Sequence, residues 1–141
     1  MEIRQVTPFF AVADQVVEDD LPALQAKGFK TLICNRPDGE ADGQPAAEML
    51  AAKAREHGFD WYWIPISSGN FSQDAVLAFE QAMAATDQPV LAFCRSGTRS
   101  ITLWALSQAT QRPAAVLLEA AARAGYDLSA MVPLLEARFK G

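Results

Sequence analysis

Residues 94–100 read Cys-Arg-Ser-Gly-Thr-Arg-Ser, and this stretch with its two flanks is the strongest indication of the class of fold. Residues 89–93 before it form an apolar run that is typical of a short buried strand, and residues 101–106 after it are typical of a helix. A cysteine therefore follows directly on a strand, and a Ser-Gly-Thr turn leads into a helix. In that geometry successive backbone N–H groups face one concavity, and the helix dipole adds positive potential there.

This turn predicts a nucleophile beside its own anion site. Cys94 should ionise easily there, because the donors that hold an anion also stabilise a thiolate. Arg99 would close the concavity with a planar fork that suits an oxyanion. The alternative interpretation is a buried structural cysteine with a surface arginine nearby.

Length and composition limit the classes of protein to consider. The chain has 141 residues, half of them apolar, so we expect one domain over residues 1–141. A formal charge of −5 and the lack of a basic run argue against a nucleic-acid partner. We expect a cytoplasmic protein, since no apolar stretch has the length of a membrane span and residues 1–5 do not resemble a signal peptide. Two distant cysteines make neither a disulfide framework nor a metal site, and no cofactor is expected.

Strands and helices alternate along the chain. The sequence predicts strands at residues 9–12, 30–35, 61–64 and 89–93. It predicts helices at residues 19–28, 45–57 and 72–85, from residue 101 onward, and at 113–124 and 129–139. This alternation predicts an α/β three-layer sandwich with a mostly parallel central sheet. The loops after residues 35, 64 and 93 should then meet around Cys94 at one sheet edge.

The chain is similar to the bacterial beta-lactamase-hydrolase-like family in four segments, Cys-Asn-Arg-Pro-Asp-Gly-Glu at 34–40, Ile-Pro-Ile at 64–66, residues 94–100, and Gly-Tyr-Asp-Leu at 125–128. The resemblance implies a fold like the cysteine-dependent dual-specificity phosphatases. For relatives fused to a metallo-beta-lactamase-type domain it implies a role in hydrogen sulfide and persulfide metabolism. The single histidine, His57, cannot supply the metal site of such a domain.

Three departures from the phosphatase pattern bear on the chemistry. Phosphatases of this class use His-Cys-x5-Arg, whereas Cys94 and Arg99 are spaced Cys-x4-Arg, as in rhodanese-type sulfurtransferases. Phe93 stands where the phosphatase histidine would be. Residues 64–68, Ile-Pro-Ile-Ser-Ser, lack the aspartate that serves those enzymes as general acid. A smaller loop suits a sulfur atom better than a phosphoryl group, and sulfur transfer needs less help from an acid.

These departures favour a rhodanese-type sulfurtransferase. In this hypothesis the Cys94 thiolate takes sulfur from a small anionic donor such as thiosulfate or a persulfide, and an acceptor thiol removes it. The first alternative is a phosphatase that hydrolyses a phosphoester through a phosphocysteine. The second is a non-catalytic module that senses an anion or a persulfide. The sequence leaves the oligomeric state open.

The main candidate residues divide into two groups, catalytic and substrate-binding. Cys94 and Arg99 are predicted to be catalytic. The predicted substrate-binding residues are Arg95, Ser96, Gly97, Thr98 and Ser100. Arg95 either binds an anionic substrate or is a solvated surface residue. The Thr98 and Ser100 hydroxyls either donate to the thiolate or fix the loop, and for Ser100 simple capping of the helix is the alternative.

Asp38 and Cys34 are possible secondary members of the site. Asp38, or Asp74 on a helix, could replace the missing acid, although each fits a solvated surface carboxylate better. Cys34 could form a protective disulfide with Cys94 or accept its sulfur, or it could simply fill core volume.

Overall fold

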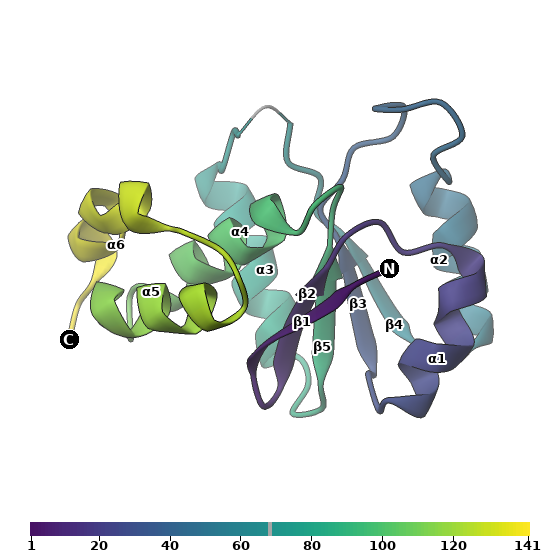
Figure 1. Ribbon diagram of the computed structural model, residues 1–141, viewed down its shortest axis with the longest axis horizontal. Coiled ribbons are helices and arrows are strands. Elements are labelled where there is room, and N and C mark those ends of the chain that lie inside the picture. Colours follow the sequence, from purple (N-terminus) through teal and green to yellow (C-terminus); the bar gives the residue numbers. More distant parts are fainter. Residues whose placement is uncertain (68) are drawn as a thin grey trace.

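A five-stranded sheet lies at the centre of the computed structural model, which describes residues 1–67 and 69–141 (Figure 1). Ser68, the last residue of the stretch that lacks the phosphatase general acid, is outside the described residues. The strand order is β1-β2-β5-β3-β4, with β5 in the middle. The strands are β1 (Ile3–Thr7), β2 (Phe10–Ala13), β3 (Thr31–Cys34), β4 (Asp60–Trp63) and β5 (Val90–Phe93).

Helices cover both faces of this sheet, which confirms the three-layer α/β prediction (Figure 1). One face carries η1 (Glu18–Asp20), α1 (Leu21–Ala26) and α2 (Ala47–Glu56). The other carries α3 (Gln73–Ala84), α4 (Thr98–Gln108), α5 (Ala114–Arg123), η2 (Ser129–Met131) and α6 (Val132–Arg138).

The core lies in two layers, one on each side of β5. Val90 and Ala92 pack on the α3–α4 side, whereas Leu91 and Phe93 pack on the α1–α2 side. Because both faces of a central parallel strand are buried, its sequence is a continuous apolar run. This packing fixes the end of β5, and with it the residue that follows, Cys94.

The sequence-based prediction missed one strand, β1. This strand pairs antiparallel with β2, and every other pairing in the sheet is parallel. β1 lies at the sheet edge, and its residues Arg4 and Gln5 are half-buried and exposed, respectively. A half-solvated edge strand does not produce the apolar run that revealed the other strands.

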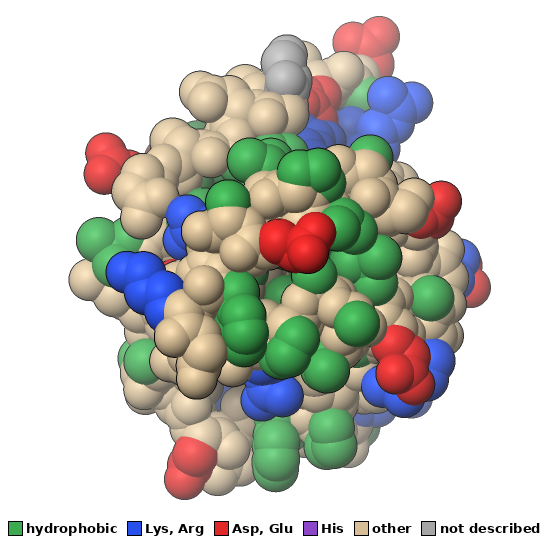
Figure 2. Space-filling view, turned by 90° about the vertical axis from the view of Figure 1, so that its left-hand side faces the viewer, with side chains coloured by type: hydrophobic (Ala, Val, Ile, Leu, Met, Phe, Trp, Pro, Cys, Tyr) green, Lys and Arg blue, Asp and Glu red, His purple; other side chains and the backbone are tan. Residues whose placement is uncertain are grey.

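The α5–α6 end of the molecule, at the left of Figure 1, faces the viewer in Figure 2. Hydrophobic side chains there are interspersed with acidic and basic ones. Val116, Leu134 and Phe139 are exposed on these elements. None of the described helices combines the length and the apolar character that crossing a membrane requires.

Candidate active site

Cys94 is the first residue after β5, and its side chain is fully buried. Its Sγ accepts a hydrogen bond of 3.1 Å from the backbone N–H of Gly97. Gly97 has φ of 88° and precedes the first residue of α4, Thr98. Only glycine adopts this left-handed conformation readily, so Gly97 allows the chain to turn from the strand into the helix above the sulfur. The turn thus has the strand-to-helix form that the sequence predicts.

Arg99 lies in the first turn of α4, and its guanidinium binds a carboxylate. Its Nη1 and Nη2 each donate to Glu40 at 2.8 Å, and Nη1 also donates to the carbonyl of Ile66 at 2.9 Å. This is the two-pronged geometry with which arginine binds planar oxyanions. Glu40 therefore occupies the side of Arg99 that an anionic substrate would use.

A second arginine holds the same carboxylate. Arg36 is buried, and its Nε donates to Glu40 at 3.0 Å while its Nη1 donates to Gln15 at 3.0 Å. The hydrogen bond from Arg99, with help from Arg36, lowers the pKa of Glu40 to about 2. Glu40 is therefore ionised near neutral pH, and the cluster of two arginines and one glutamate keeps a net positive charge.

Replacing Glu40 with glutamine should reduce the sensitivity of the fold to acid. Because the pKa of Glu40 is about 2 in the folded protein and about 4.5 ordinarily, its ionised form adds stability above about pH 4.5. That contribution is lost as the pH falls toward about 2. Urea unfolding at about pH 6 and about pH 3 should show a smaller loss of unfolding free energy in Glu40→Gln than in the parent.

The matched control for this prediction is Glu119→Gln. Glu119 also pairs with an arginine, Arg123, but its side chain is 71% exposed on α5. This control should lose as much stability in acid as the parent protein. Equal losses in Glu40→Gln and Glu119→Gln would contradict the role assigned to the Glu40 pair.

The loops after β3, β4 and β5 meet at this edge, as predicted. Ser100 donates its hydroxyl to Asn35 Oδ1 at 2.8 Å, and Asn35 Nδ2 donates to the carbonyl of Ile64 at 2.9 Å. The backbone N–H of Ile66 returns a bond of 3.0 Å to the Asn35 carbonyl. Buried Asn35 therefore connects the loops after β3 and β4 to the first turn of α4.

The other loop residues divide into those that fix the loop and those that face solvent. The hydroxyls of Ser96 and Thr98 lie 3.0 Å apart and hydrogen-bond each other, and Ser100 bonds Asn35. These contacts are consistent with hydroxyls that fix the loop, and donation from Thr98 or Ser100 to the Cys94 thiolate stays a prediction. Arg95 is exposed and lines an open surface pocket together with Glu40, Gly69 and Arg99.

The possible secondary residues have other contacts. Asp38 accepts the backbone N–H of Ala47 at 2.8 Å, so its carboxylate caps the start of α2. Asp74 lies in the first turn of α3. Cys34 is a buried free thiol whose Sγ donates to the Arg36 carbonyl at 3.6 Å, and burial raises its pKa to about 12. A thiol with that pKa stays protonated, which favours a packing role, and a redox role for Cys34 stays a prediction.

Three residues of the site were not identified from the sequence. Glu40 binds Arg99, Asn35 connects the loops, and Tyr126 donates its hydroxyl to the Ser96 carbonyl at 2.8 Å. All three lie inside the family-like segments at 34–40 and 125–128, which was the available signal. Nothing in local sequence, however, indicates which distant group each side chain contacts.

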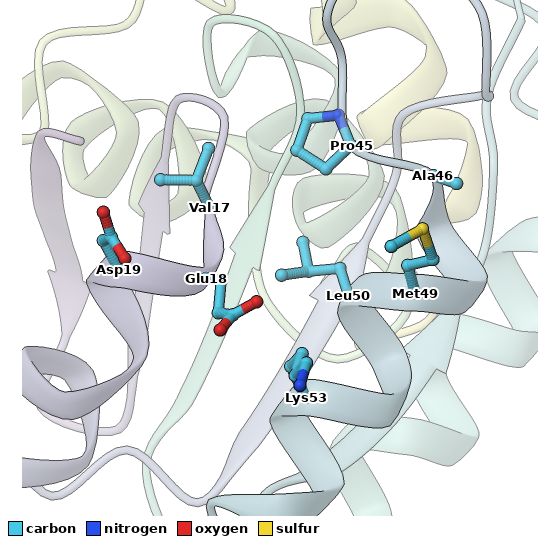
Figure 3. Close-up of a pocket in the computed structure, with 8 residues that line it drawn as sticks. All are labelled: Val17, Glu18, Asp19, Pro45, Ala46, Met49, Leu50 and Lys53. Carbon is cyan, nitrogen blue, oxygen red and sulfur yellow. The ribbon is translucent and has the colours of Figure 1, made fainter.

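A separate cleft of about 360 Å³ lies between η1 and α2 (Figure 3). Its walls are largely hydrophobic, with Glu18 and Lys53 placed on opposite elements. It is lined by Val17, Glu18, Asp19, Pro45, Ala46, Met49, Leu50 and Lys53. These residues include none of those that surround Cys94. Among the described residues, no group of three His, Cys, Asp or Glu side chains could hold a metal ion.

Comparison with solved structures places the fold among the cysteine-dependent phosphatases. A provisionally assigned phosphatase of Neisseria meningitidis Z2491 superposes with a TM-score of 0.84 at 28% identity, covering 98% of this chain and 99% of that one. The protein Tk-PTP superposes with a TM-score of 0.74 at 16% identity, covering 97% of each chain. The second likeness is one of fold alone.

Sequence relatives agree with this placement. A beta-lactamase hydrolase-like protein of Agrobacterium fabrum is 38% identical over 109 residues, which is 77% of this chain. The chain spans about a quarter of the length of that relative. Residues 2–111 match the family described as beta-lactamase hydrolase-like protein, phosphatase-like domain. The chain therefore belongs to the phosphatase-like domain family of the beta-lactamase hydrolase-like proteins.

Proposed function

We propose that the chain is a cysteine-dependent phosphatase that hydrolyses phosphate monoesters with good leaving groups. The observation that carries the proposal is the loop at the end of β5, where the Gly97 N–H bonds Cys94 Sγ and the Arg99 fork is bound to a carboxylate. An anion already held by Arg99 marks the position that a phosphoryl group would take. The phosphatase relatives support the proposal.

The reaction has two steps. The Cys94 thiolate attacks phosphorus, an S–P bond forms, and the P–O bond to the alcohol breaks with its electron pair leaving on oxygen. Water then attacks phosphorus, releases inorganic phosphate and regenerates the thiolate. Arg99 binds the non-bridging oxygens in both steps, and for this the substrate takes the place of Glu40 on the guanidinium.

The leaving group receives little protonation in this mechanism. Asp38 is engaged with the start of α2. Glu40, once displaced from Arg99, keeps the hydrogen bond from buried Arg36, which lowers its pKa and favours the ionised form near neutral pH. A general acid typically contributes about 10²–10⁴ in rate, so its absence restricts the enzyme to alcohols that leave without a proton. Phenols with electron-withdrawing substituents are such leaving groups.

A series of aryl phosphates tests this proposal. Among the esters whose phenols have the lowest pKa, we expect kcat/KM to fall by about tenfold or more for each unit rise in the pKa of the leaving phenol. A flat dependence would contradict the absence of an acid. No phosphate release from any ester in the series would contradict the phosphatase assignment itself.

Sulfur transfer is the second candidate, and the Cys-x4-Arg spacing of Cys94 and Arg99 favours it. Incubation of the reduced protein with thiosulfate, and separately with glutathione persulfide, would then add one sulfur atom to Cys94, with sulfite or the glutathione thiolate as the leaving group. A thiol or cyanide would remove that atom, and Cys94→Ser would not acquire it. The phosphatase proposal predicts no stable sulfur adduct and continued release of phosphate from esters.

A further inference from the structure

Tyr126 lies against the outside of the loop that carries Cys94. Its hydroxyl donates to the Ser96 carbonyl at 2.8 Å, and the Gly97 N–H donates to Cys94 Sγ at 3.1 Å. The Ser96 carbonyl and the Gly97 N–H belong to the same planar peptide group, in which they point in opposite directions. The tyrosine therefore holds one end of the peptide whose other end contacts the sulfur.

We propose that Tyr126 is a positioning residue for the nucleophile, which orients the peptide between Ser96 and Gly97 so that its N–H points at Cys94. This rests on the proposed function only in taking Cys94 as the nucleophile. A hydrogen bond accepted by a carbonyl also polarises the N–H of the same peptide, so the Tyr126 hydroxyl strengthens the bond to sulfur as well as aiming it. The effect is greatest when the sulfur carries a negative charge.

The phenol is itself held in place from two sides. Gly125, with φ of 97°, ends α5 and lets the Tyr126 N–H donate to the Ala121 carbonyl at 2.9 Å. The Arg4 guanidinium of β1 lies 5.6 Å from the centre of the Tyr126 ring, and its Nη1 donates to the Ala124 carbonyl at 3.2 Å. The edge strand and the end of α5 thus hold the tyrosine against the loop.

Tyr126 packs tightly against the loop at Gly97. A Cβ atom added at Gly97 would overlap the Tyr126 hydroxyl. Glycine at 97 therefore serves both the backbone turn and the close approach of the phenol.

The tyrosine remains a hydrogen-bond donor over the working pH range. Burial raises the pKa of Tyr126 above its ordinary value, so the hydroxyl stays protonated. The other charged or titratable groups that act on the phenol or on Cys94 are Glu2, Arg4, Asp14, Cys34 and Arg99.

The test is the pH dependence of Cys94 alkylation in Tyr126→Phe. This variant keeps the aromatic ring and removes only the hydroxyl, and Tyr62→Phe, at the only other tyrosine of the chain, is the matched control. Each protein is treated with iodoacetamide across a pH series, and mass spectrometry of the peptides assigns the label to Cys94 or Cys34. We expect the midpoint for Cys94 to rise by about 0.5–1 pH unit in Tyr126→Phe and to stay unchanged in Tyr62→Phe.

If Tyr126→Phe does not fold, a second variant, Arg4→Met, tests the same proposal. Arg4→Met keeps the phenol but removes the guanidinium from its ring, and it should raise the Cys94 midpoint by a smaller amount in the same direction. An unchanged midpoint in the folded variants would overturn the proposal, even if their thermal stability falls. Failure of Cys94 in the parent protein to react at any pH would instead remove the nucleophile, and with it the proposed function.

Discussion

Replacing Cys94 with serine is expected to reduce the hydrolysis of aryl phosphates by at least about 10³-fold. The serine hydroxyl stays protonated near neutral pH, so it presents no anionic nucleophile to phosphorus. The Gly97 N–H that contacts the sulfur remains in place, as does the Arg99 fork. Steady-state release of inorganic phosphate by equal amounts of the two proteins measures the loss.

The same variant separates the role of the nucleophile from that of the anion-binding loop. Cys94→Ser should still bind inorganic phosphate within about threefold of the parent affinity, because Arg99 and the loop backbone supply the binding. Titration calorimetry with phosphate gives that affinity. If the variant retained a tenth or more of the parent turnover, Cys94 would not be the nucleophile.

Replacing Arg99 with lysine is expected to lower kcat by about 10²–10³-fold. Lysine keeps the positive charge but offers a single point of contact, whereas the guanidinium donates from both Nη1 and Nη2. The developing charge on the phosphoryl oxygens then loses one of its two hydrogen bonds. The fold should persist, because Arg36 still neutralises Glu40.

Arg123→Lys is the matched control for this substitution. Arg123 is exposed on α5, where it forms a surface pair with Glu119. Its kcat and KM should equal those of the parent. A value of kcat for Arg99→Lys within tenfold of the control would mean that Arg99 does not stabilise the transition state.

Much of the fold follows from short-range patterns. The buried strand before Cys94 could be identified because both of its faces need apolar side chains, and Gly28 and Gly58 at helix ends have the positive φ that such ends use. β1 could not be identified in this way. It is a half-exposed edge strand whose partner, β2, specifies it only after both have formed.

For the candidate site, only the residues that share one loop could be placed together from the sequence. Cys94 and Arg99 lie within one loop, so their proximity follows from the chain itself. Glu40 and Tyr126 reach that loop from 59 and 30 residues away, respectively. Their contacts depend on how α2, α5 and the sheet pack, and a charged or aromatic residue in a loop does not reveal its partner.

The preference for sulfur transfer rested on spacing and on a missing acid. In the structure two carboxylates of the loop after β3 are engaged, Asp38 at the start of α2 and Glu40 on Arg99. Family membership nevertheless supports the phosphatase alternative better. A Cys-x4-Arg loop defines where the nucleophile and the arginine lie, and it does not by itself distinguish phosphorus from sulfur as the atom attacked.

The intact mass of the protein, quenched in acid during turnover of an aryl phosphate, shows directly whether Cys94 carries the transferred phosphoryl group. We predict the gain of one phosphoryl group, mapped to the peptide that contains Cys94 and missing from Cys94→Ser. A protein that releases phosphate from the ester without ever carrying a phosphoryl group on Cys94 would contradict the account. So would a protein that leaves the ester intact and instead takes up a sulfur atom from thiosulfate.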